Sequence, residues 1–535
     1  PVVPVAAFTA AADAYPLDCE LGDGTPRIWS VNNAGIEPPG AGPWLPGVGG
    51  SLDIQSMGEN VLVPNPAYQG INVVNPGSKN ILRDYGFGTA GKVTLTEPNG
   101  TTEHELELTA GTTWNPNAIQ VDVPDGLPEG PYQLTITRAD TGMSTVNGVT
   151  VHLGGGVPTV VAGPEWIGGD DQYGAIQAAI EAAEPGDLIT VAPGVYQEMV
   201  QMHKPVRLQG WGEGTTIDAV EKTPSALQAW RGRIDLWFDY GLFDIVPGQE
   251  AGTAVGLLEP TLLFNEEGAG ILALAKQDGD WSRTLIDGFT IAGADSGGGI
   301  VVNGFASGLT VSNNRVINNA GIKSGGIRLG HPTLIAEATS GACAEGEATC
   351  YADAGNHGID IHHNYVGLNG GQSGAGGGVS LHTGSDGYAL TDNYICGNFN
   401  MDQGGGVAHY GYSAGDNVIA RNTIVFNDSF KQTPGSTPAG GGLLIAGKPP
   451  VQGELVTEGS GNVLVDSNLF LGNAAEAGDG GGIRLQAING ADVDANSNNS
   501  SKWHSIEIVN NMIANNLSAL AGGGISIADA KNVVI

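Results

Sequence analysis

The 535-residue chain contains an alternating run of oxygen donors, the clearest pattern in it that could bind a metal. The run is Asp492, Asp494, Asn496 and Asn498. Carboxylate and amide oxygens at alternate positions are typical of loops that bind calcium. The glycine and the closing glutamate of an EF-hand loop are missing, so an exposed polar loop is the alternative reading. Calcium is the one cofactor that the sequence suggests.

A second group of residues could bind sugars. It lies in a long insertion at residues 220–280 and includes Trp230, Trp237, Asp239 and Tyr240. Aromatic rings beside carboxylates can stack on sugars and hydrogen-bond them, which predicts a polysaccharide as a partner. The same residues could instead form a small satellite core with a charged rim.

Five of the ten histidines fall within residues 357–409. His362 and His363 are adjacent in an expected strand, so they point to different faces. His363 stands beside a column of asparagines, and His409 falls where neighbouring repeats have leucine or isoleucine. This scatter argues against a site of three histidines around one metal ion.

Cys343 and Cys350 share one short loop rich in Gly, Ala and Glu. Their closeness predicts a local disulfide, which favours an extracellular or cell-surface location. A zinc site is a poor alternative because the loop contains no histidine.

The charge of the chain limits its partners. Lys and Arg number 21 against 56 Asp and Glu, a formal net charge of −35. Nucleic acids and anionic membranes attract Lys and Arg, so neither is expected as a partner. No run of about 20 apolar residues occurs, and no membrane span is predicted.

Internal repeats determine the expected fold. Pairs of Asn five residues apart recur with apolar residues at fixed offsets, and each pair is followed by a glycine run and an apolar strand. Short strands that cannot close a core alone are typical of solenoids, where stacking at about 4.8 Å builds continuous interior columns. The pattern predicts a right-handed parallel β-helix with asparagine ladders at tight bends, where Asn tolerates the left-handed conformation. The first ladder comprises Asn314, Asn364, Asn393, Asn422, Asn468 and Asn511.

The start of the solenoid carries a cap pattern. A helix is expected at 173–184, followed by a strand at Asp187–Val191 and the segment Arg207–Gly212. These segments resemble the N-terminal cap of pectate-lyase-like β-helices, a resemblance that implies the fold and no particular reaction. The solenoid is expected to span 156–535, and its last coil to be continued by further chain or capped by another copy, because an open end exposes strand edges.

Ahead of the solenoid, residues 81–155 alternate as short strands separated by turn signals. Tyr85–Gly88, Trp114–Asn115 and Ile119–Pro124 resemble the immunoglobulin-like IPT/TIG family, which implies a β-sandwich spacer or binding module. Residues 1–80 have weak periodicity and are expected to be an irregular lead-in or a partial β-domain. The fold class is therefore all-β.

Three functions remain open on the sequence. The glycine runs and Phe470–Asn473 resemble repeats of polymorphic outer-membrane and autotransporter proteins, which implies a bacterial cell-surface scaffold or adhesion module. A polysaccharide lyase or another carbohydrate-active enzyme is the second reading, with Arg328, Arg421 and Arg484 as outward basic residues. The third is a structural segment of a giant secreted protein with a multicopper oxidase domain elsewhere. The motifs of polygalacturonases and alginate epimerases are absent, so catalytic residues are not assigned.

Overall fold

The structure is a computed structural model that describes residues 19–35, 40–47, 49–68, 77–98, 100–164, 166–167, 173–220, 224–249, 263, 267–332, 334–343, 345–430, 438–449 and 457–535. It divides into two compact units. The first comprises Pro1–Val157 and Trp211–Glu213, and the second comprises Pro158–Gly210 and Gly214–Ile535.

The first unit is a β-sandwich with its own apolar core. Its eight strands run in the order β1-β3-β8-β7-β6-β9-β10-β2, and β7 pairs with both β8 and β6. The strands are β1 (Ile28–Ala34), β2 (Trp44–Leu45), β3 (Gly50–Ser56), β6 (Gly91–Thr96), β7 (Glu103–Leu108), β8 (Ala118–Val123), β9 (Gly130–Arg138) and β10 (Val149–Leu153). The sandwich thus includes strands at residues 28–56, upstream of the segment from 81 where the sequence pattern became clear. A separate hairpin pairs β4 (Val61–Pro64) with β5 (Asn80–Arg83).

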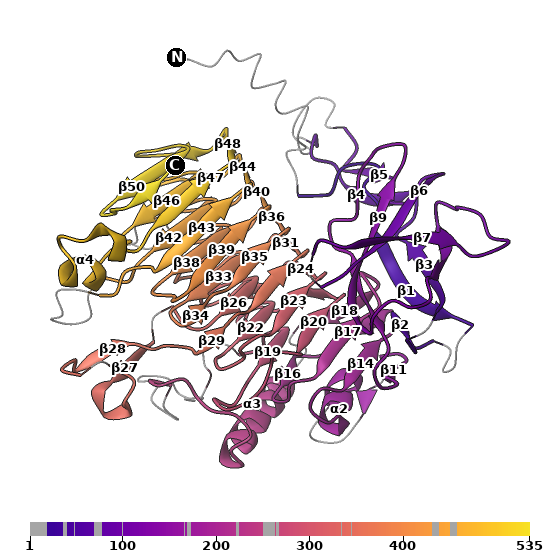
Figure 1. Cartoon of the computed structure of the whole chain (residues 1–535), viewed down its shortest axis with the longest axis horizontal. Coiled ribbons are helices and arrows are strands. Elements are labelled where there is room, and N and C mark those ends of the chain that lie inside the picture. Colours follow the sequence, from indigo (N-terminus) through magenta and orange to yellow (C-terminus); the bar gives the residue numbers. More distant parts are fainter. Residues whose placement is uncertain are drawn as a thin grey trace. The chain divides into compact units, whose positions relative to one another are not determined.

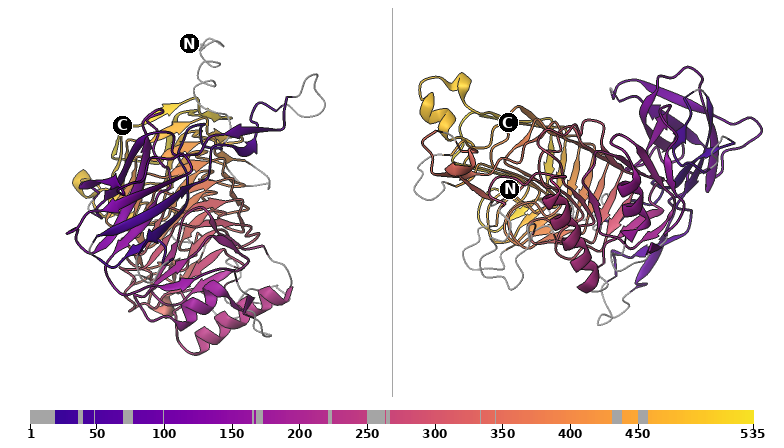
Figure 2. Two further views of the ribbon diagram at one scale, coloured as in Figure 1. Left: turned by 90° about the vertical axis from the view of Figure 1, so that its right-hand side faces the viewer. Right: turned by 90° about the horizontal axis from the view of Figure 1, so that it is seen from below.

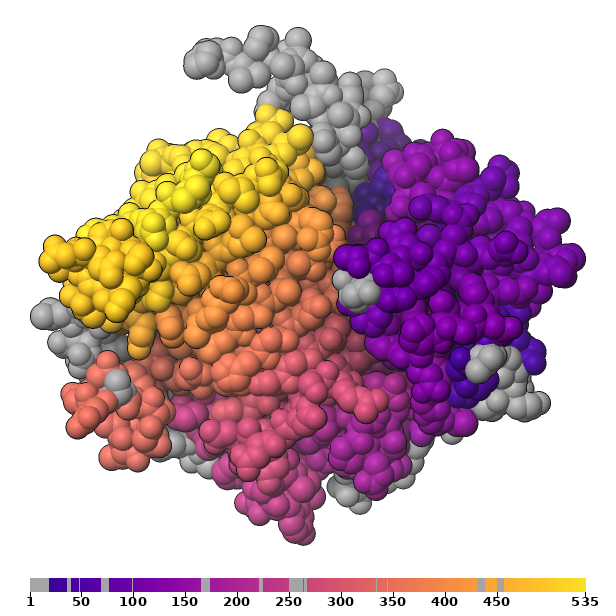
Figure 3. All heavy atoms as spheres, viewed as in Figure 1, coloured from indigo at the N-terminus to yellow at the C-terminus, as the bar shows by residue number. Residues whose placement is uncertain are grey.

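The second unit is a parallel β-helix, visible in Figure 1 as stacked strands whose colour changes coil by coil. The space-filling view shows the same coils as successive bands (Figure 3). Sheet 1 is formed by β11 (Thr159–Val161), β14 (Leu188–Val191), β17 (Arg207–Gly210), β20 (Leu285–Asp287), β23 (Thr310–Ser312), β30 (Asp360–His362), β35 (Ala389–Thr391), β39 (Asp416–Ala420), β43 (Asn462–Asp466), β47 (Ile506–Val509) and β51 (Val533–Val534).

Two further sheets accompany sheet 1 along the solenoid, and a short fourth sheet begins at β25. Sheet 2 is formed by β15 (Gly194–Tyr196), β18 (Thr215–Asp218), β21 (Thr290–Ala292), β24 (Arg315–Ile317), β31 (Tyr365–Gly367), β36 (Tyr394–Cys396), β40 (Thr423–Val425), β44 (Leu469–Leu471) and β48 (Met512–Ala514). Sheet 3 is formed by β16 (Val200–Met202), β19 (Ile271–Ala273), β22 (Ile300–Val302), β26 (Ile327–Leu329), β33 (Val379–His382), β38 (Val407–Tyr410), β42 (Leu443–Ala446), β46 (Ile483–Gln486) and β50 (Ile525–Ala528). The short sheet 4 is formed by β25 (Ala320–Gly321), β32 (Gly370–Gly371), β37 (Phe399–Asn400), β41 (Asp428–Ser429), β45 (Ala474–Ala475) and β49 (Leu517–Ser518).

The interior of the solenoid is built from the apolar positions of the repeat. Ile361, Leu390 and Ile419 form one column on sheet 1, and Val366 and Ile395 belong to the facing column on sheet 2. All five side chains are fully buried. Each apolar repeat position therefore contributes to one continuous core, as the periodicity predicted.

The first asparagine ladder links consecutive coils by hydrogen bonds. In each rung the side-chain Oδ1 accepts from both the backbone N–H and the Nδ2 of the Asn one coil earlier, as Asn393 does from Asn364 at 2.9 and 3.0 Å. Its Nδ2 also donates to the carbonyls of Ile361 and Thr391. Because every polar atom of the buried amide is bonded, the bend is held rigidly from coil to coil.

The left-handed conformation does not fall on the ladder residues themselves, contrary to the sequence expectation. It falls on the residue before each one, so His363, Asp392 and Arg421 have φ of 52°, 58° and 55°. Asparagine therefore occupies the ladder positions because of the hydrogen bonds that its side chain makes. The positions before the ladder carry varied side chains, although the left-handed conformation costs about 1 kcal/mol for most residues.

The glycine runs mark places where coils approach closely. A Cβ on Gly441 would lie 2.1 Å from the carbonyl oxygen of Ala474 in the next coil, and one on Gly481 would lie 2.2 Å from that of Leu517. Any larger residue would push the coils apart, which explains the repeated glycine.

The helices α2 (Ala175–Ala182) and α3 (Pro224–Asp239) lie outside the stack of strands (Figure 2). The cap helix α2 lies within the predicted range 173–184, and its first N–H groups donate to the Glu198 carboxylate. The helix α3 packs on the outer face of sheet 3. No helix in the described ranges is long and apolar enough to cross a membrane.

Candidate functional site

The residues predicted to bind sugars lie on α3 and just after it, and the structure separates them. Trp230 and Trp237 are 1% and 4% exposed and belong to a satellite core that includes Leu272 of sheet 3. Asp239 is exposed, and Tyr240 is 73% exposed. Both indoles are therefore closed to a ligand, and the satellite core that the sequence left open as an alternative is present.

The four predicted calcium ligands lie on a short helix, α4 (Ala491–Ala495), and the turn after it. The Asp492 carboxylate accepts hydrogen bonds from the backbone N–H groups of Gly490 and His504, both at 2.7 Å. Burial raises the pKa of Asp492, but these hydrogen bonds outweigh burial and leave the pKa below its usual value. No group of three His, Cys, Asp or Glu side chains suited to a metal ion occurs among the described residues. Calcium at Asp492, Asp494, Asn496 and Asn498 stays a prediction.

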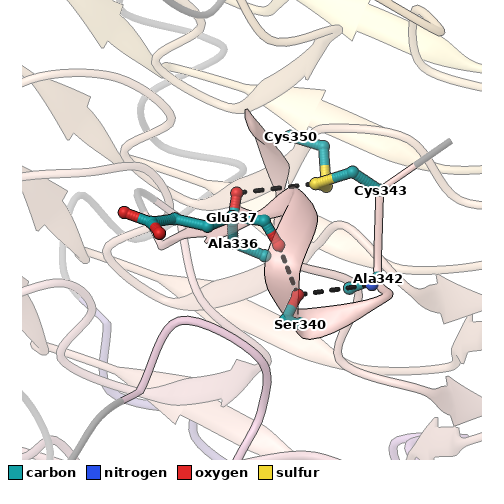
Figure 4. The surroundings of a disulfide bond; sticks show 6 residues. All are labelled: Ala336, Glu337, Ser340, Ala342, Cys343 and Cys350. Carbon is teal, nitrogen blue, oxygen red and sulfur yellow. Dashed lines mark hydrogen bonds between the residues drawn. A yellow bond between two sulfur atoms is a disulfide. The ribbon is translucent and has the colours of Figure 1, made fainter. Parts of the chain in front are cut away.

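Cys343 and Cys350 form a disulfide that closes a hairpin on the outside of the solenoid (Figure 4). The hairpin pairs β27 (Ile335–Glu337) with β28 (Thr349–Tyr351), and Ala336 lies opposite Cys350. No described cysteine is a free thiol. Cross-links of this kind are typical of oxidising compartments.

The histidines of residues 357–409 divide between the inside and the outside of the solenoid. His409 is buried on β38, where its ring nitrogens bond the Tyr388 hydroxyl at 2.9 Å and the Ser460 carbonyl at 2.8 Å. His382 is fully buried at the end of β33. His362 and His363, in contrast, are partly exposed and lie among other ionisable side chains.

These neighbours come from three consecutive coils of sheet 1. Strands β30, β35 and β39 pair residue for residue, so the residues that follow them, His363, Asp392 and Arg421, lie one above another. Asp360 and His362, the first and last residues of β30, complete the group. We call these five residues the Asp360–Asp392 cluster.

A forked ion pair fixes one carboxylate of the cluster. Arg421 donates from Nε to Oδ1 of Asp392 at 2.9 Å and from a terminal nitrogen to Oδ2 at 2.7 Å. The guanidinium is 57% exposed and the carboxylate 29% exposed. An ion pair this exposed contributes little to stability, but its two-point geometry holds the Asp392 carboxylate in one orientation.

The two histidines of the cluster form a hydrogen bond with each other through their Nδ1 atoms. Their Nδ1 atoms are 3.0 Å apart, so one ring must donate and the other accept. Burial lowers the pKa of both rings, and for His363, whose pKa falls to about 4, the neighbouring His362 lowers it further. Both imidazoles are therefore neutral at pH 7 and can each donate or accept a hydrogen bond.

Asp360 is the second carboxyl group and differs from Asp392 in its surroundings. Burial raises its pKa to about 6, and the charge of Asp392 adds to this, while His363 and Arg421 oppose it. Its Oδ1 atom is buried and has no hydrogen-bond partner in the described part of the chain. Asp360 can therefore hold a proton at mildly acidic pH beside an Asp392 that is ion-paired with Arg421.

Two coils earlier, Asp287 shows what a purely structural carboxylate looks like on this face. It is fully buried and accepts hydrogen bonds from Gln209 and Ser312, both at 2.6 Å, and from Asn313 at 2.7 Å. Its oxygens are thus engaged by protein donors. Protein donors do not occupy both oxygens of Asp360 in this way, so its carboxyl group is available to a ligand.

Two neighbouring carboxyl groups with different environments can work as an acid and a base. The less solvated group keeps its proton and can donate it, while the ion-paired group can activate water or attack a carbon. Glycoside hydrolysis uses this combination. The cluster therefore has the groups that acid–base cleavage of a sugar polymer requires.

Asp392→Asn is expected to lower the pKa of Asp360, because it removes a neighbouring negative charge. The pKa should stay above the ordinary value of 3.8, since burial is the larger cause. Carboxyl-carbon NMR of labelled protein measures it, and Asp466→Asn, two coils further along, is the matched control that should change little. An unchanged Asp360 pKa in Asp392→Asn would show that the two groups are not coupled.

The sequence pointed to part of this cluster. Arg421 was recognised as outward and basic, and His363 as a neighbour of the ladder, but Asp360 and Asp392 were not predicted as site residues. The signal was the position before each ladder asparagine, where His, Asp and Arg follow one another in consecutive repeats. Arg328 is buried on sheet 3, and Arg484 bonds Asp479, so neither joins Arg421.

Comparisons with known proteins add little. No family model and no curated protein matches the sequence. Among solved structures, the catalytic domain of a GH87 alpha-1,3-glucanase in complex with nigerose aligns over 91% of this chain and 92% of its own, with 11% identity and a TM-score of 0.21. A likeness this low carries no argument about the reaction. The resemblance of residues 81–155 to the IPT/TIG family stays a prediction.

Proposed function

We propose that this protein is a secreted carbohydrate-active enzyme that cleaves a polysaccharide by acid–base catalysis on the outer face of sheet 1. The observation that carries the proposal is the Asp360–Asp392 cluster, which places two carboxyl groups in unlike surroundings on one partly exposed face. Asp360 would donate a proton to the glycosidic oxygen, and Asp392 would activate water or attack the anomeric carbon.

The neutral histidines and the regular coil spacing support a polymeric sugar as the substrate. His362 and His363 can exchange hydrogen bonds with hydroxyl groups without adding charge. Equivalent positions recur about every 4.8 Å along the face, which suits an extended chain better than a compact molecule. The disulfide at Cys343 and Cys350 supports an extracellular location.

A scaffold or adhesion role is the second candidate, alone or as a segment of a larger secreted protein. It is favoured by the first asparagine ladder, whose hydrogen bonds join consecutive coils without a break from Asn314 to Asn511. On this view the cluster would bind a glycan without cleaving it.

The test is to incubate the whole chain with neutral glucans and with uronic-acid polymers, measuring new reducing ends and unsaturated products. We expect new reducing ends, with a rate that falls as pH rises above about 6, because Asp360 must be protonated to act as the acid. Unsaturated products would instead indicate elimination. Binding without any new chain ends would favour the scaffold.

A further inference from the structure

Lys448 carries a buried amine just after β42 of sheet 3, whereas the Asp360–Asp392 cluster lies on sheet 1. Lys448 is 3% exposed, and its Nζ has no hydrogen-bond partner among the described residues. Nζ lies 4.7 Å from the centroid of the Tyr351 ring and 4.3 Å from that of Tyr410. The ammonium group is thus enclosed by two aromatic rings.

The described charged groups around Lys448 are mainly basic. Lys323 lowers the pKa of Lys448 electrostatically, and Lys448, Arg328 and His331 in turn lower that of His382. No carboxylate acts detectably on Lys448, and Asp402 acts on Tyr410 instead. This grouping of basic side chains stands out in a chain with a net charge of −35.

The protein alone does not compensate the Lys448 charge. A buried ammonium without hydrogen bonds or a counter-ion is strongly unfavourable, and each cation–π contact returns only about 0.5–2 kcal/mol. Burial accordingly lowers the pKa of Lys448 to about 7, and Lys323 adds to the effect. The phenol of Tyr410, with a pKa raised to about 12 by burial, stays protonated and supplies no negative charge.

We propose that Lys448, Tyr351 and Tyr410 form a binding site for a single oxyanion group, a carboxylate or a sulfate. An oxyanion would supply both the counter-ion and the hydrogen-bond acceptor that Nζ lacks. The enclosure by two rings limits the ligand to a small group, which is either a free anion or an acidic substituent of a sugar. This site does not depend on the proposed function, because it shares no residue with the Asp360–Asp392 cluster.

Titration calorimetry of the whole protein with inorganic sulfate tests the proposal. Binding should be about tenfold tighter at pH 6 than at pH 8, because the amine changes from mostly protonated to mostly neutral over that interval. His382, Tyr351 and Tyr410, which face it, are not expected to change charge there. His331 also belongs to this basic group, so the titration is repeated at both pH values with Lys448→Met, in which any pH dependence due to His331 alone would persist. Repeating the titration in buffers of different ionisation enthalpy should show proton uptake on binding at pH 7, a readout that needs no variant.

Lys448→Met should abolish sulfate binding, and Lys502→Met, at an exposed lysine, should leave it unchanged. Tighter binding of a uronic or sulfated oligosaccharide than of inorganic sulfate would identify a sugar substituent as the natural group. Equal binding would identify a free anion. Absence of sulfate binding to the wild-type protein, binding without proton uptake, or equal binding to Lys448→Met would overturn the site.

Discussion

Asp360→Asn is expected to reduce polysaccharide cleavage by about 10²- to 10⁴-fold, the contribution typical of a general acid. The amide keeps the size of the side chain but carries no proton to donate at mildly acidic pH. The residual rate should also lose its dependence on pH near 6, because Asp360 is the group with a pKa of about 6. Initial rates of reducing-end formation across pH 4 to 8 measure both effects.

The same substitution should not destabilise the protein, so a loss of activity can be assigned to catalysis and not to unfolding. The folded-state pKa of about 6 lies above the ordinary 3.8, so the ionised carboxyl disfavours the folded state, and stability is lost as pH rises from about 4 to 6. Two pKa units correspond to about 3 kcal/mol, and less once partial exposure is allowed for. At pH 8 Asp360→Asn should therefore be at least as stable as the wild type.

The matched control is Asp466→Asn on the same face of sheet 1. Asp466 hydrogen-bonds Asn510 and Ser467, and its charge acts on Arg421 but not detectably on Asp360. Its replacement should change the rate by no more than a fewfold. Equal losses in the two variants would mean that neutralising any carboxylate of this face impairs the protein, and Asp360 would lose its special role.

Asn393→Ala is expected to lower the free energy of unfolding of the solenoid by about 3–5 kcal/mol. The side chain is 1% exposed and makes five hydrogen bonds, three from Nδ2 and two to Oδ1. Alanine leaves buried donors and acceptors of three coils without partners, and each such group costs about 1–3 kcal/mol, partly offset by relaxation. Chemical denaturation monitored by circular dichroism measures the change.

Asn511→Ala provides the comparison for the ladder. Asn511 makes four of these five contacts and lacks the one from Nδ2 to a following ladder Asn. Its side chain is also partly exposed, so water can replace the lost bonds. We expect about half the loss seen for Asn393→Ala. If both variants lose less than about 1 kcal/mol, the ladder is not a main source of stability.

The fold of the solenoid was predictable because each coil repeats one simple rule. Each ladder asparagine has an apolar residue three positions before it and another two positions after it, such as Leu390 and Ile395 around Asn393. These apolar residues indicated the interior columns directly. The strands at residues 28–56 were less visible. Their pairing partners lie far away in the sequence, as with Leu52 and Val121, and no periodic pattern reports such contacts.

The candidate site was less predictable because its chemistry depends on packing between coils. Asp360 and Asp392 are 32 positions apart, and nothing in either segment shows that burial raises the pKa of one while Arg421 pairs with the other. The tryptophans of α3 posed the opposite problem, because their residue type suggested a sugar-binding site as well as a satellite core. Residues with strong sugar-binding character, such as Trp230, can be used for a satellite core, and only burial separates the two uses.

The most direct test of the proposed site is a crystal structure of Asp360→Asn soaked with an oligosaccharide of a polymer that the wild-type protein cleaves. The account predicts that the sugar lies on the outer face of sheet 1, with a glycosidic oxygen within hydrogen-bond distance of residue 360 and a sugar ring beside His362 and Asp392. A sugar bound on another sheet, away from the Asp360–Asp392 cluster, would contradict it.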